Sequence, residues 1–237
     1  MQRIIALIPA RSGSKRVRDK NIRQLGEHPL IGWSIITARR LVGVSEIVVS
    51  TDSEEYARIA EDYGAIALIR PPDLASDDTG DHPVIKHFLQ HFPTDLVIYL
   101  RPTTPFRSVA KIEEAIGTLI YAGDYATSLR SIEEMGESAW KCFHLRHGYL
   151  VPLRGDMGAA NLPNHLVTKT YRGNGYVDII KSKQVSDPAS GPEGGAITDN
   201  LWGDRCIGFV TPRAIEIDTE DDLRFAEFSL KRKEGEG

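Results

Sequence analysis

The clearest sign of the fold lies in residues 3–21, RIIALIPARSGSKRVRDKN. The compact apolar run from Arg3 to Ile8, ended by Pro9, is typical of a strand buried on both faces of a parallel sheet. A basic loop that contains Gly13 follows this strand at once. Open α/β sheets bind ligands outside the carboxyl ends of their strands, so the loop is a candidate ligand site.

Strand-like and helix-like segments alternate along most of the chain after this loop. Pro29 stands where a helix would begin, Ser53 can cap the next helix, and Gly43 and Gly64 end the two helical spacings. We expect further strands at about 46–50, 65–69, 96–100, 125–129 and 206–211, and helices at about 30–42, 53–63, 83–91, 109–122 and 219–230. This alternation predicts an α/β fold with a doubly wound, mostly parallel sheet.

The alternation breaks between about residues 131 and 204. Short apolar pieces, at 149–153 and 175–180, are separated there by stretches that contain Gly and Pro. The Gly- and Pro-rich stretch 186–195 is interpreted as a surface loop, because strand and helix signals resume after it. We therefore predict a single domain over 1–237 with an inserted subregion at about 131–204.

Composition excludes several classes of protein. The chain has 237 residues, 26% of them charged, and a net charge of -4, which argues against a protein that coats nucleic acid. Its two cysteines, Cys142 and Cys206, lie far apart, which favours a reducing cytoplasmic setting without disulfides. No apolar run approaches the roughly 18 residues of a membrane span, and the N-terminus is too short in apolar residues for a secretory signal. The histidines form no zinc-binding pattern, and no GxSxG motif is present.

The basic loop after the first strand suits a polyphosphate ligand. Arg11, Lys15 and Lys20 supply positive charge, two serines supply hydroxyl donors, and Gly13 lets backbone N–H groups approach a ligand closely. The segment matches neither GxxxxGK[ST] nor GxGxxG, so it supports neither a P-loop ATPase nor a dinucleotide dehydrogenase. The alternative is a solvated basic loop with no ligand.

A second candidate follows the strand at 96–100, where Arg101 and Arg107 flank a turn that two prolines make rigid. Two arginines on a rigid turn suggest an anionic substrate, although a purely structural connection fits equally well.

A third candidate is the pair Glu216 and Asp218. In an extended segment alternate side chains share a face, so these two carboxylates could hold Mg²⁺ on phosphates. Asp218 could instead cap the helix that follows, and spacing alone favours the cap. Asp52, which ends another strand, could likewise cap a helix or face a ligand.

Six motifs that occur in order along the chain resemble those of one family, the N-acylneuraminate cytidylyltransferases. This family includes the CMP-sialic acid synthetases and their relatives for legionaminic and pseudaminic acids, and the resemblance covers nearly the whole chain. The motifs are 8–15 with Lys20 and Asn21, 49–52, Arg70-Pro71 with 74–77, 102–107, Tyr171-Arg172 with Asn174-Gly175, and 217–219.

The resemblance implies a Rossmann-like fold of the nucleotide-diphospho-sugar transferase type. It also implies that CMP passes from CTP to the anomeric hydroxyl of a 2-keto sugar acid, with Mg²⁺ as cofactor and pyrophosphate as second product. By the same resemblance, the region 131–204 is a dimerisation subdomain of a homodimer, and Arg172 serves a neighbouring subunit's sugar site. The alternative is that this region is a plain structural excursion.

The site residues that the resemblance implies fall into four groups. We expect catalytic roles for Arg11, Lys20 and Asp218, and CTP contacts from Arg11, Ser14, Lys15, Lys20, Asn21, Arg70, Ser76 and Asp81. We expect sugar-acid contacts from Arg101, Thr103, Thr104, Lys141, Arg172 and Asn174, and metal contacts from Asp218 and Glu216.

Two residues depart from the family pattern. Glu216 replaces an aspartate that many sialic acid synthetases carry, so its role as a metal ligand stays open. Arg101 replaces a glutamine near the sugar, and a permanent forked cation should change which sugar is recognised. A bacterial-type nonulosonate is therefore our hypothesis for the acceptor. The competing interpretations are a CMP-KDO synthetase, a transferase of another nucleotide, and a catalytically silent sugar-nucleotide binding protein.

Overall fold

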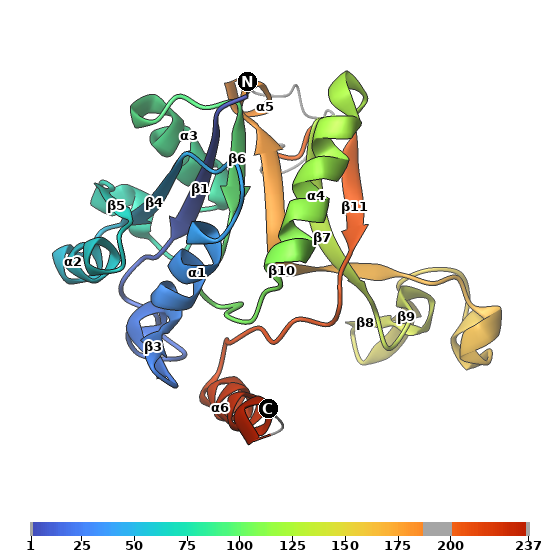
Figure 1. Cartoon of the computed structure of the whole chain (residues 1–237). Helices are drawn as coiled ribbons and strands as arrows, with labels where there is room; N and C mark the ends of the chain where they lie inside the picture. Colours follow the sequence, from blue (N-terminus) through green and yellow to red (C-terminus); the bar gives the residue numbers. More distant parts are fainter. Residues whose placement is uncertain (1, 187–200, 236–237) are drawn as a thin grey trace.

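A seven-stranded sheet forms the centre of the molecule in the computed structural model, which describes residues 2–186 and 201–235 (Figure 1). Its strand order is β11-β7-β10-β6-β1-β4-β5, and every strand runs parallel to the others except β10. The predicted doubly wound, mostly parallel α/β fold is confirmed. The strands are β1 (Ile4–Pro9), β4 (Glu46–Thr51), β5 (Ile66–Ile69), β6 (Leu96–Tyr99), β7 (Ser128–Glu134), β10 (Tyr171–Lys181) and β11 (Cys206–Val210).

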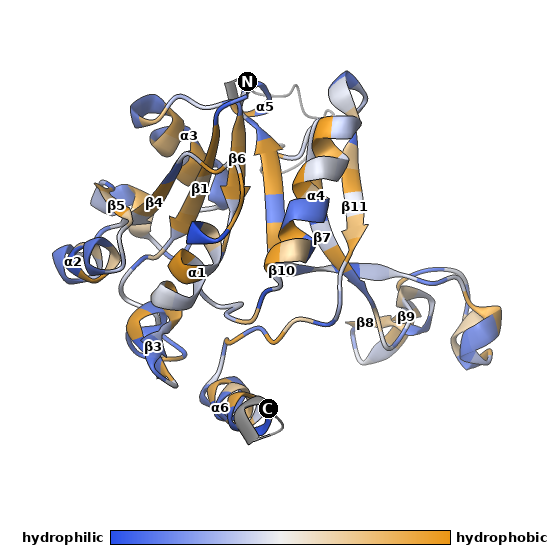
Figure 2. Cartoon of the chain, viewed as in Figure 1, coloured by the Kyte–Doolittle hydropathy of each residue, from blue (hydrophilic) through white to orange (hydrophobic). Residues whose placement is uncertain are grey.

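Helices cover both faces of this sheet. Alternate residues of β1 point to opposite sides, with Ala6 and Ile8 in one apolar cluster and Ile5 and Leu7 in the other. The first cluster includes residues of α1 (Leu30–Arg39), α2 (Glu54–Asp62) and α4 (Val109–Tyr121), and the second includes residues of α3 (Asp81–His91) and α5 (Ser182–Ser186). Figure 2 shows the same arrangement, with the central strands mostly hydrophobic and the outer surface of α2 hydrophilic.

The region around β7 and β10 differs from the prediction. The strand predicted at 125–129 begins only at Ser128 and runs to Glu134, because Tyr125 belongs to a 3-10 turn, η3 (Gly123–Tyr125). The short piece predicted at 175–180 is part of the long strand β10, which lies between β6 and β7 and is irregular between Gly173 and Asp178. The range 131–204 therefore contains a central strand of the main sheet.

Between β7 and β10 the chain leaves the sheet as an excursion over residues 135–170, which Figure 1 shows projecting away from the strands. It contains the hairpin β8 (Phe143–Arg146) and β9 (Tyr149–Pro152) and three 3-10 turns, η4 (Ala139–Lys141), η5 (Ala159–Asn161) and η6 (Asn164–Leu166). The Gly- and Pro-rich stretch 186–195 lies outside the described residues from position 187 onward.

The C-terminal helix α6 (Glu220–Gly235) forms a small core of its own with the segment after β1. Leu223 and Ala226 pack there with Leu25, Leu30 and Ile217. This segment holds η1 (Lys20–Ile22) and the short pair β2 (Gln24–Leu25) and β3 (His28–Pro29). The packing brings the end of the chain back to the carboxyl end of β1.

The remaining 3-10 turn, η2 (Pro72–Ala75), lies between β5 and α3. No helix in the described part of the chain is long and apolar enough to cross a membrane.

Candidate active site

The basic loop between β1 and η1 is held in shape by two polar side chains. The Ser12 backbone N–H and hydroxyl donate to the two Asp52 carboxylate oxygens at 2.8 and 2.6 Å. Burial acts to raise the pKa of Asp52, but these Ser12 hydrogen bonds bring it below its usual value. The buried Asn21 amide donates to the Arg11 carbonyl at 2.9 Å. Asp52 therefore neither caps α2, which Ser53 does, nor acts as a free carboxylate.

The cations of this loop face carboxylates from elsewhere in the chain. Arg11 and Lys15 each lie 2.5 Å from the Asp77 carboxylate, and the Lys20 ammonium lies 2.7 Å from Asp218. The hydrogen bond with Asp77 raises the pKa of Lys15, and the same contact lowers the pKa of Asp77. Positive charge is thus gathered where the sequence predicts a polyphosphate, and acidic side chains balance it.

Residues after β5 and β6 form the second wall of the site. Arg70 is buried and donates to the Ser50 carbonyl at 2.7 Å, while its Nε has no partner in the described structure. Burial lowers the pKa of Arg70. The Ser76 hydroxyl lies 2.8 Å from that of Thr79, at the entrance to α3, and Asp81 begins α3 and accepts from Tyr99 at 2.8 Å.

Two adjoining cavities join these walls into one crevice at the carboxyl ends of β1, β5 and β6. A cavity of about 420 Å³ and another of about 210 Å³ share Arg11, Ser14 and Lys20 as lining residues. The larger cavity reaches Lys15, Asp77 and Asp218. The smaller one is also lined by Asn21, Arg70, Asp81, Arg101 and Thr103. Every residue predicted to contact CTP except Ser76 therefore lines this crevice.

Arg101 is held between two carboxylates. Its guanidinium lies 2.5 Å from Asp81 and 2.5 Å from Asp178, which is only 1% exposed, and it lies over the Tyr99 ring at 4.8 Å. Burial acts to lower the pKa of Arg101, but Asp178 and Asp81 raise it above its usual value. Arg101 lines the crevice, yet its charge is already paired.

The other arginine of this turn, Arg107, has a structural role, because its guanidinium donates to backbone carbonyls. It is held by the carbonyl oxygens of Tyr176 and Arg101 at 2.5 and 2.6 Å, and burial lowers its pKa to about 9. Thr104 is fully buried, and its hydroxyl has no partner among the described residues. Gly175, at φ +63°, packs against this hydroxyl so closely that an added Cβ would lie 3.2 Å from Oγ1.

The segment before α6 brings Asp218 to the crevice. The buried Ile217 donates its backbone N–H to the Thr103 carbonyl at 2.8 Å, which ties this segment to the turn after β6. The helix cap that spacing favoured at Asp218 is wrong, because Thr219 occupies the position before α6. The Thr219 hydroxyl accepts from the Asp222 N–H at 3.2 Å, and the Asp222 carboxylate accepts from the Thr219 N–H at 2.8 Å. The Asp218 side chain is thus left to face Lys20.

A third cavity, of about 520 Å³, borders the crevice through Asp218. Arg172, Arg213, Glu216 and Phe225 also line it. Arg172 donates to Glu133 from Nε at 3.0 Å and from Nη2 at 2.7 Å.

Asn174 and Lys141, which were also predicted to contact the sugar acid, do not line this third cavity. Asn174 is buried and donates to Thr211 at 2.7 Å. Lys141 lies in the excursion, where its ammonium contacts Asn164 at 2.5 Å and Glu137 at 3.5 Å, and it lines none of the three cavities. Within one chain, Arg172 and Glu216 are thus brought beside Asp218, and Lys141 is not.

The donor set near Asp218 fits a magnesium ion only together with a nucleotide. In residues 2–186 and 201–235 no three His, Cys, Asp or Glu side chains gather as a metal site. Mg²⁺ commonly binds through one or two carboxylates, with substrate phosphates and water as the remaining ligands. Asp218 and Glu216, which line the same cavity, would supply the two carboxylates of such a site.

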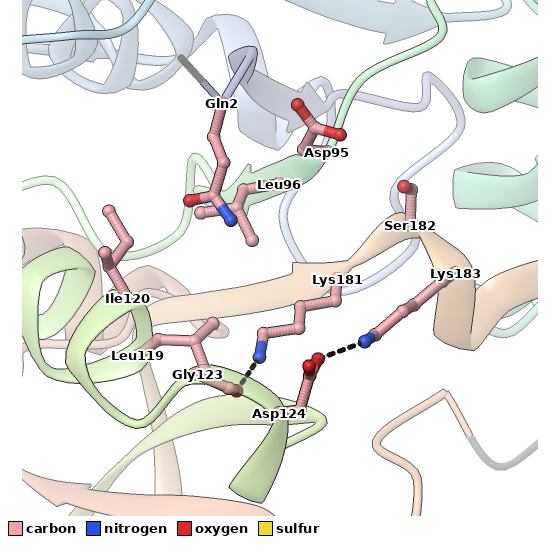
Figure 3. A pocket seen from close by; sticks show the side chains of 10 residues that line it. All are labelled: Gln2, Asp95, Leu96, Leu119, Ile120, Gly123, Asp124, Lys181, Ser182 and Lys183. Atoms are coloured by element: carbon pink, nitrogen blue, oxygen red, sulfur yellow. Dashed lines mark hydrogen bonds and ion pairs between the residues drawn. The ribbon is translucent and has the colours of Figure 1, made fainter.

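A separate cavity of about 360 Å³ lies at the opposite, amino-terminal edge of the sheet (Figure 3). Its cations are engaged: Lys181 donates to the carbonyls of Gly123 and Ala126, and Lys183 lies 2.6 Å from Asp124. Burial lowers the pKa of Lys181. Because Lys181 bonds the carbonyls that follow α4, we assign this cluster a structural role at the helix end.

The sequence analysis did not predict that three carboxylates pair with arginines of the site: Asp77, Glu133 and Asp178. Asp178 gave one signal, because a charged residue inside the apolar run 176–180 requires a buried partner. Asp77 and Glu133 gave none, since their partners are distant in sequence.

The structure is thus an α/β fold whose crevice lies at the carboxyl ends of the strands, beside the basic loop after β1. A family model described as Cytidylyltransferase matches residues 5–143. Because this match covers more than half of the chain, the chain belongs to the cytidylyltransferase family.

Curated relatives point in the same direction. The chain is 45% identical over 116 residues to the N-acylneuraminate cytidylyltransferase of Escherichia coli O18:K1:H7, a match that covers 48% of this chain and 27% of that protein. It is 44% identical over 121 residues to the CMP-N,N'-diacetyllegionaminic acid synthase of Legionella pneumophila, covering 48% and 52%. The chain thus spans about half or less of these two relatives. Over 98% of the chain it is 28% identical to the post-translational flagellin modification protein B of Campylobacter coli, covering 97% of that protein.

Among solved structures, a CMP:2-keto-3-deoxy-manno-octonic acid synthetase complexed with CTP is similar with a TM-score of 0.75 and 15% identity, covering 98% of this chain and 99% of that one. At this identity the similarity establishes the fold.

Proposed function

We propose that the protein transfers CMP from CTP to the anomeric hydroxyl of a 2-keto nonulosonic acid and releases pyrophosphate. The observation that carries this proposal is that the two crevice cavities share three lining residues of the basic loop, Arg11, Ser14 and Lys20. One cavity extends from these residues to Asp218, and the other extends to Arg70 and Asp81. Family membership and the names of the two relatives above support the choice of nucleotide and acceptor.

In the proposed reaction, the acceptor's hydroxyl oxygen bonds to the α-phosphorus of CTP as the bond to the pyrophosphate oxygen breaks, and the hydroxyl proton is released. Such transfers depend mainly on positioning and on stabilisation of developing charge. Arg11, Lys15 and Lys20 would offset the charge of the triphosphate and of the leaving pyrophosphate. Mg²⁺ bound to Asp218, with Glu216 as a further ligand, would neutralise phosphate charge and orient the reactants.

The base and ribose of CTP would lie toward the smaller cavity. Arg70, Asn21 and Asp81 line it, and Ser76 lies at its rim beside Thr79. Asp81 is fixed by Tyr99 and Arg101, so its carboxylate offers an oriented acceptor. Thr103 and Thr104 would support the sugar side, where the turn after β6 meets the segment that carries Asp218.

We also propose that the active form is a homodimer built through the excursion 135–170. Large apolar side chains are exposed on it, including Leu145 at 73%, Tyr149 at 76% and Leu166 at 62%. A second copy would cover these residues and could bring Lys141 or Arg172 to the partner's acceptor site. The mass in solution at micromolar concentration tests this, and a fully active monomer would refute it.

We propose the cytoplasm as the place of the reaction, because CTP is found inside cells.

Measurement of pyrophosphate release with Mg²⁺, CTP and a panel of sialic, legionaminic, pseudaminic and KDO-type acids tests the function. We expect turnover with a nonulosonic acid, and far faster turnover with CTP than with UTP, GTP or ATP. Preference for KDO would favour the CMP-KDO synthetase alternative. CTP binding without pyrophosphate release for any acceptor would favour a catalytically silent binding protein.

A further inference from the structure

Arg213 is an arginine at the acceptor side that the sequence motifs do not include. It follows β11 by three residues and is exposed. Its side chain lines the 520 Å³ cavity together with Arg172 and Asp218. Across residues 2–186 and 201–235, its guanidinium makes no hydrogen bond or ion pair, so its charge and its donors are available to a ligand.

The other arginines near this cavity are already engaged. Arg101 is paired with Asp81 and Asp178, and Arg107 donates to backbone carbonyls. Arg172 directs Nε and Nη2 to the same Glu133 oxygen. A ligand carboxylate would have to displace Asp81 or Asp178 from Arg101 and backbone carbonyls from Arg107. Arg172 is 57% exposed and keeps donors for a ligand, but its charge is already balanced by Glu133.

The charge of the cavity favours a free cation for an anionic acceptor. Glu216, Asp218 and Asp222 line it, and Glu133 already balances Arg172. Lys20 pairs with Asp218, but Glu216 and Asp222 would still repel a carboxylate that entered, so a guanidinium without a protein partner would favour its binding. The exposed ring of Phe225 and the side chain of Ile215 give the cavity an apolar wall as well. An unpaired guanidinium, that of Arg213, beside this apolar wall suits an acceptor that carries one carboxylate and apolar acyl groups.

We propose that Arg213 binds the carboxylate of the acceptor and thereby selects sugar acids over neutral sugars. This inference rests on the proposed function and adds a specificity-determining residue to it. A guanidinium can hold a carboxylate through two parallel N–H donors, which fixes the orientation of the sugar ring as well as its charge. The anomeric hydroxyl would then face Asp218 and the crevice that holds the nucleotide.

The test compares three substitutions in the full chain. R213Q removes the charge, R213K keeps the charge but loses the fork, and R205Q removes a comparable exposed arginine at the other end of β11. Initial rates of pyrophosphate release are measured against acceptor at saturating CTP, and against CTP at saturating acceptor. Loss of a charge-assisted pair predicts that R213Q raises the KM for the sugar acid about tenfold or more. We expect an intermediate rise for R213K, no change for R205Q, and a KM for CTP within about twofold of wild type for all three.

A second measurement uses the acceptor with its carboxylate converted to a neutral amide. Wild type should lose at least about tenfold in kcat/KM with this analogue, whereas R213Q should discriminate little between acid and amide. Equal discrimination by wild type and R213Q would overturn the role of Arg213 while leaving the proposed function intact. If wild type releases no pyrophosphate with any 2-keto sugar acid, the proposed function fails and this inference fails with it.

Discussion

The Lys20 ammonium lies 2.7 Å from the Asp218 carboxylate, although 198 positions separate the two residues in the chain. The pair joins the loop after β1 to the segment before α6. Lys20 is mostly buried, with 16% of its side chain exposed, whereas Asp218 is 45% exposed. A partly exposed pair of this kind contributes little to stability. Both partners can therefore turn to a polyphosphate and its metal ion at small cost.

Substitution of Asp218 should separate a metal-binding role from a structural one. We expect D218N to lower Mg²⁺-dependent kcat about a hundredfold or more, because a metal ligand stabilises several kcal/mol of charge in the transition state. The free energy of unfolding should change by less than about 1 kcal/mol, since the carboxylate is half-exposed. Urea unfolding and Mg²⁺ titration of the rate check both parts.

The matched control is T219A, one position further along. The Thr219 hydroxyl caps α6, so its loss should cost about 1 kcal/mol of stability and leave the Mg²⁺ dependence of the rate unchanged. A wild-type rate in D218N would refute the assignment of Asp218 to the metal.

Local sequence patterns were sufficient for most of the fold. The apolar run of β1, the cap at Ser53 and the glycine after α2 each act over a few residues, and the structure places those elements close to their predicted bounds. β10 was underestimated because its first half, Tyr171–Gly175, is polar and its pairing with β7 is irregular between Gly173 and Asp178. Its place between β6 and β7 depends on pairing with distant strands. The Asp218 cap was wrong because α6 begins at Glu220, one residue later than that cap requires, and Thr219 can also cap a helix.

The candidate site was predicted less completely than the fold. The loops after β1 and β6 could be located because strand ends are visible in the sequence. The pairing of Arg101 with Asp81 and Asp178 could not, since it depends on how α3 and β10 approach β6 in space. The sequence predicts that the Arg101 cation changes which sugar is recognised, and it does not reveal that two carboxylates already pair with this cation.

Asp77 pairs with Arg11 and Lys15, the cations to which we assign the phosphates of CTP in the proposed function. We expect D77N to bind CTP about two- to fivefold more tightly than wild type, because an exposed carboxylate no longer competes for the two cations. Calorimetric titration with CTP measures the change. The control is D78N, whose carboxylate is exposed beside Asp77 but makes no ion pair with the loop in the described structure. Weaker CTP binding by D77N than by D78N would mean that Asp77 assists the nucleotide.

Arg101 and Asp178 form a buried pair whose two halves depend on each other. R101Q would leave the Asp178 carboxylate buried without its 2.5 Å partner, and Arg130 lies 3.9 Å away. We expect a loss of about 3–5 kcal/mol in the free energy of unfolding for R101Q, and a smaller loss for D178N because Arg101 keeps its pair with Asp81. The double variant should lose clearly less than the sum, because the buried Asp178 charge that R101Q leaves without Arg101 is then absent.

Urea unfolding of the two single variants and the double variant measures this coupling. R224Q is the control, since Arg224 pairs with Asp221 on the exposed surface of α6 and should cost no more than about 0.5 kcal/mol. Additive losses for R101Q and D178N would contradict the interdependence of the pair.

Glu133 should make the stability of the protein depend on pH. Burial acts to raise the pKa of Glu133, but hydrogen bonds from Arg172, the Ala214 N–H and Asn174 bring it below its usual value of 4.5. A carboxyl group whose pKa is lowered by folding adds stability above its unfolded pKa, and that stability is lost as the pH falls through the folded value. E133Q should therefore be about 1–3 kcal/mol less stable than wild type at neutral pH. The difference should shrink as the pH drops below 4.5, because wild type then becomes protonated at Glu133.

Urea unfolding at a series of pH values from neutral to acid measures this difference. E134Q is the matched control: its side chain lies one position further along, pairs with Lys169 at 2.9 Å, and is about half-exposed. Its loss should change the free energy of unfolding by less than about 1 kcal/mol at every pH. If the gap between E133Q and wild type stayed constant down to the acid limit, the charge of Glu133 would not be what stabilises the start of β10. Arg172 would then owe its position to packing alone.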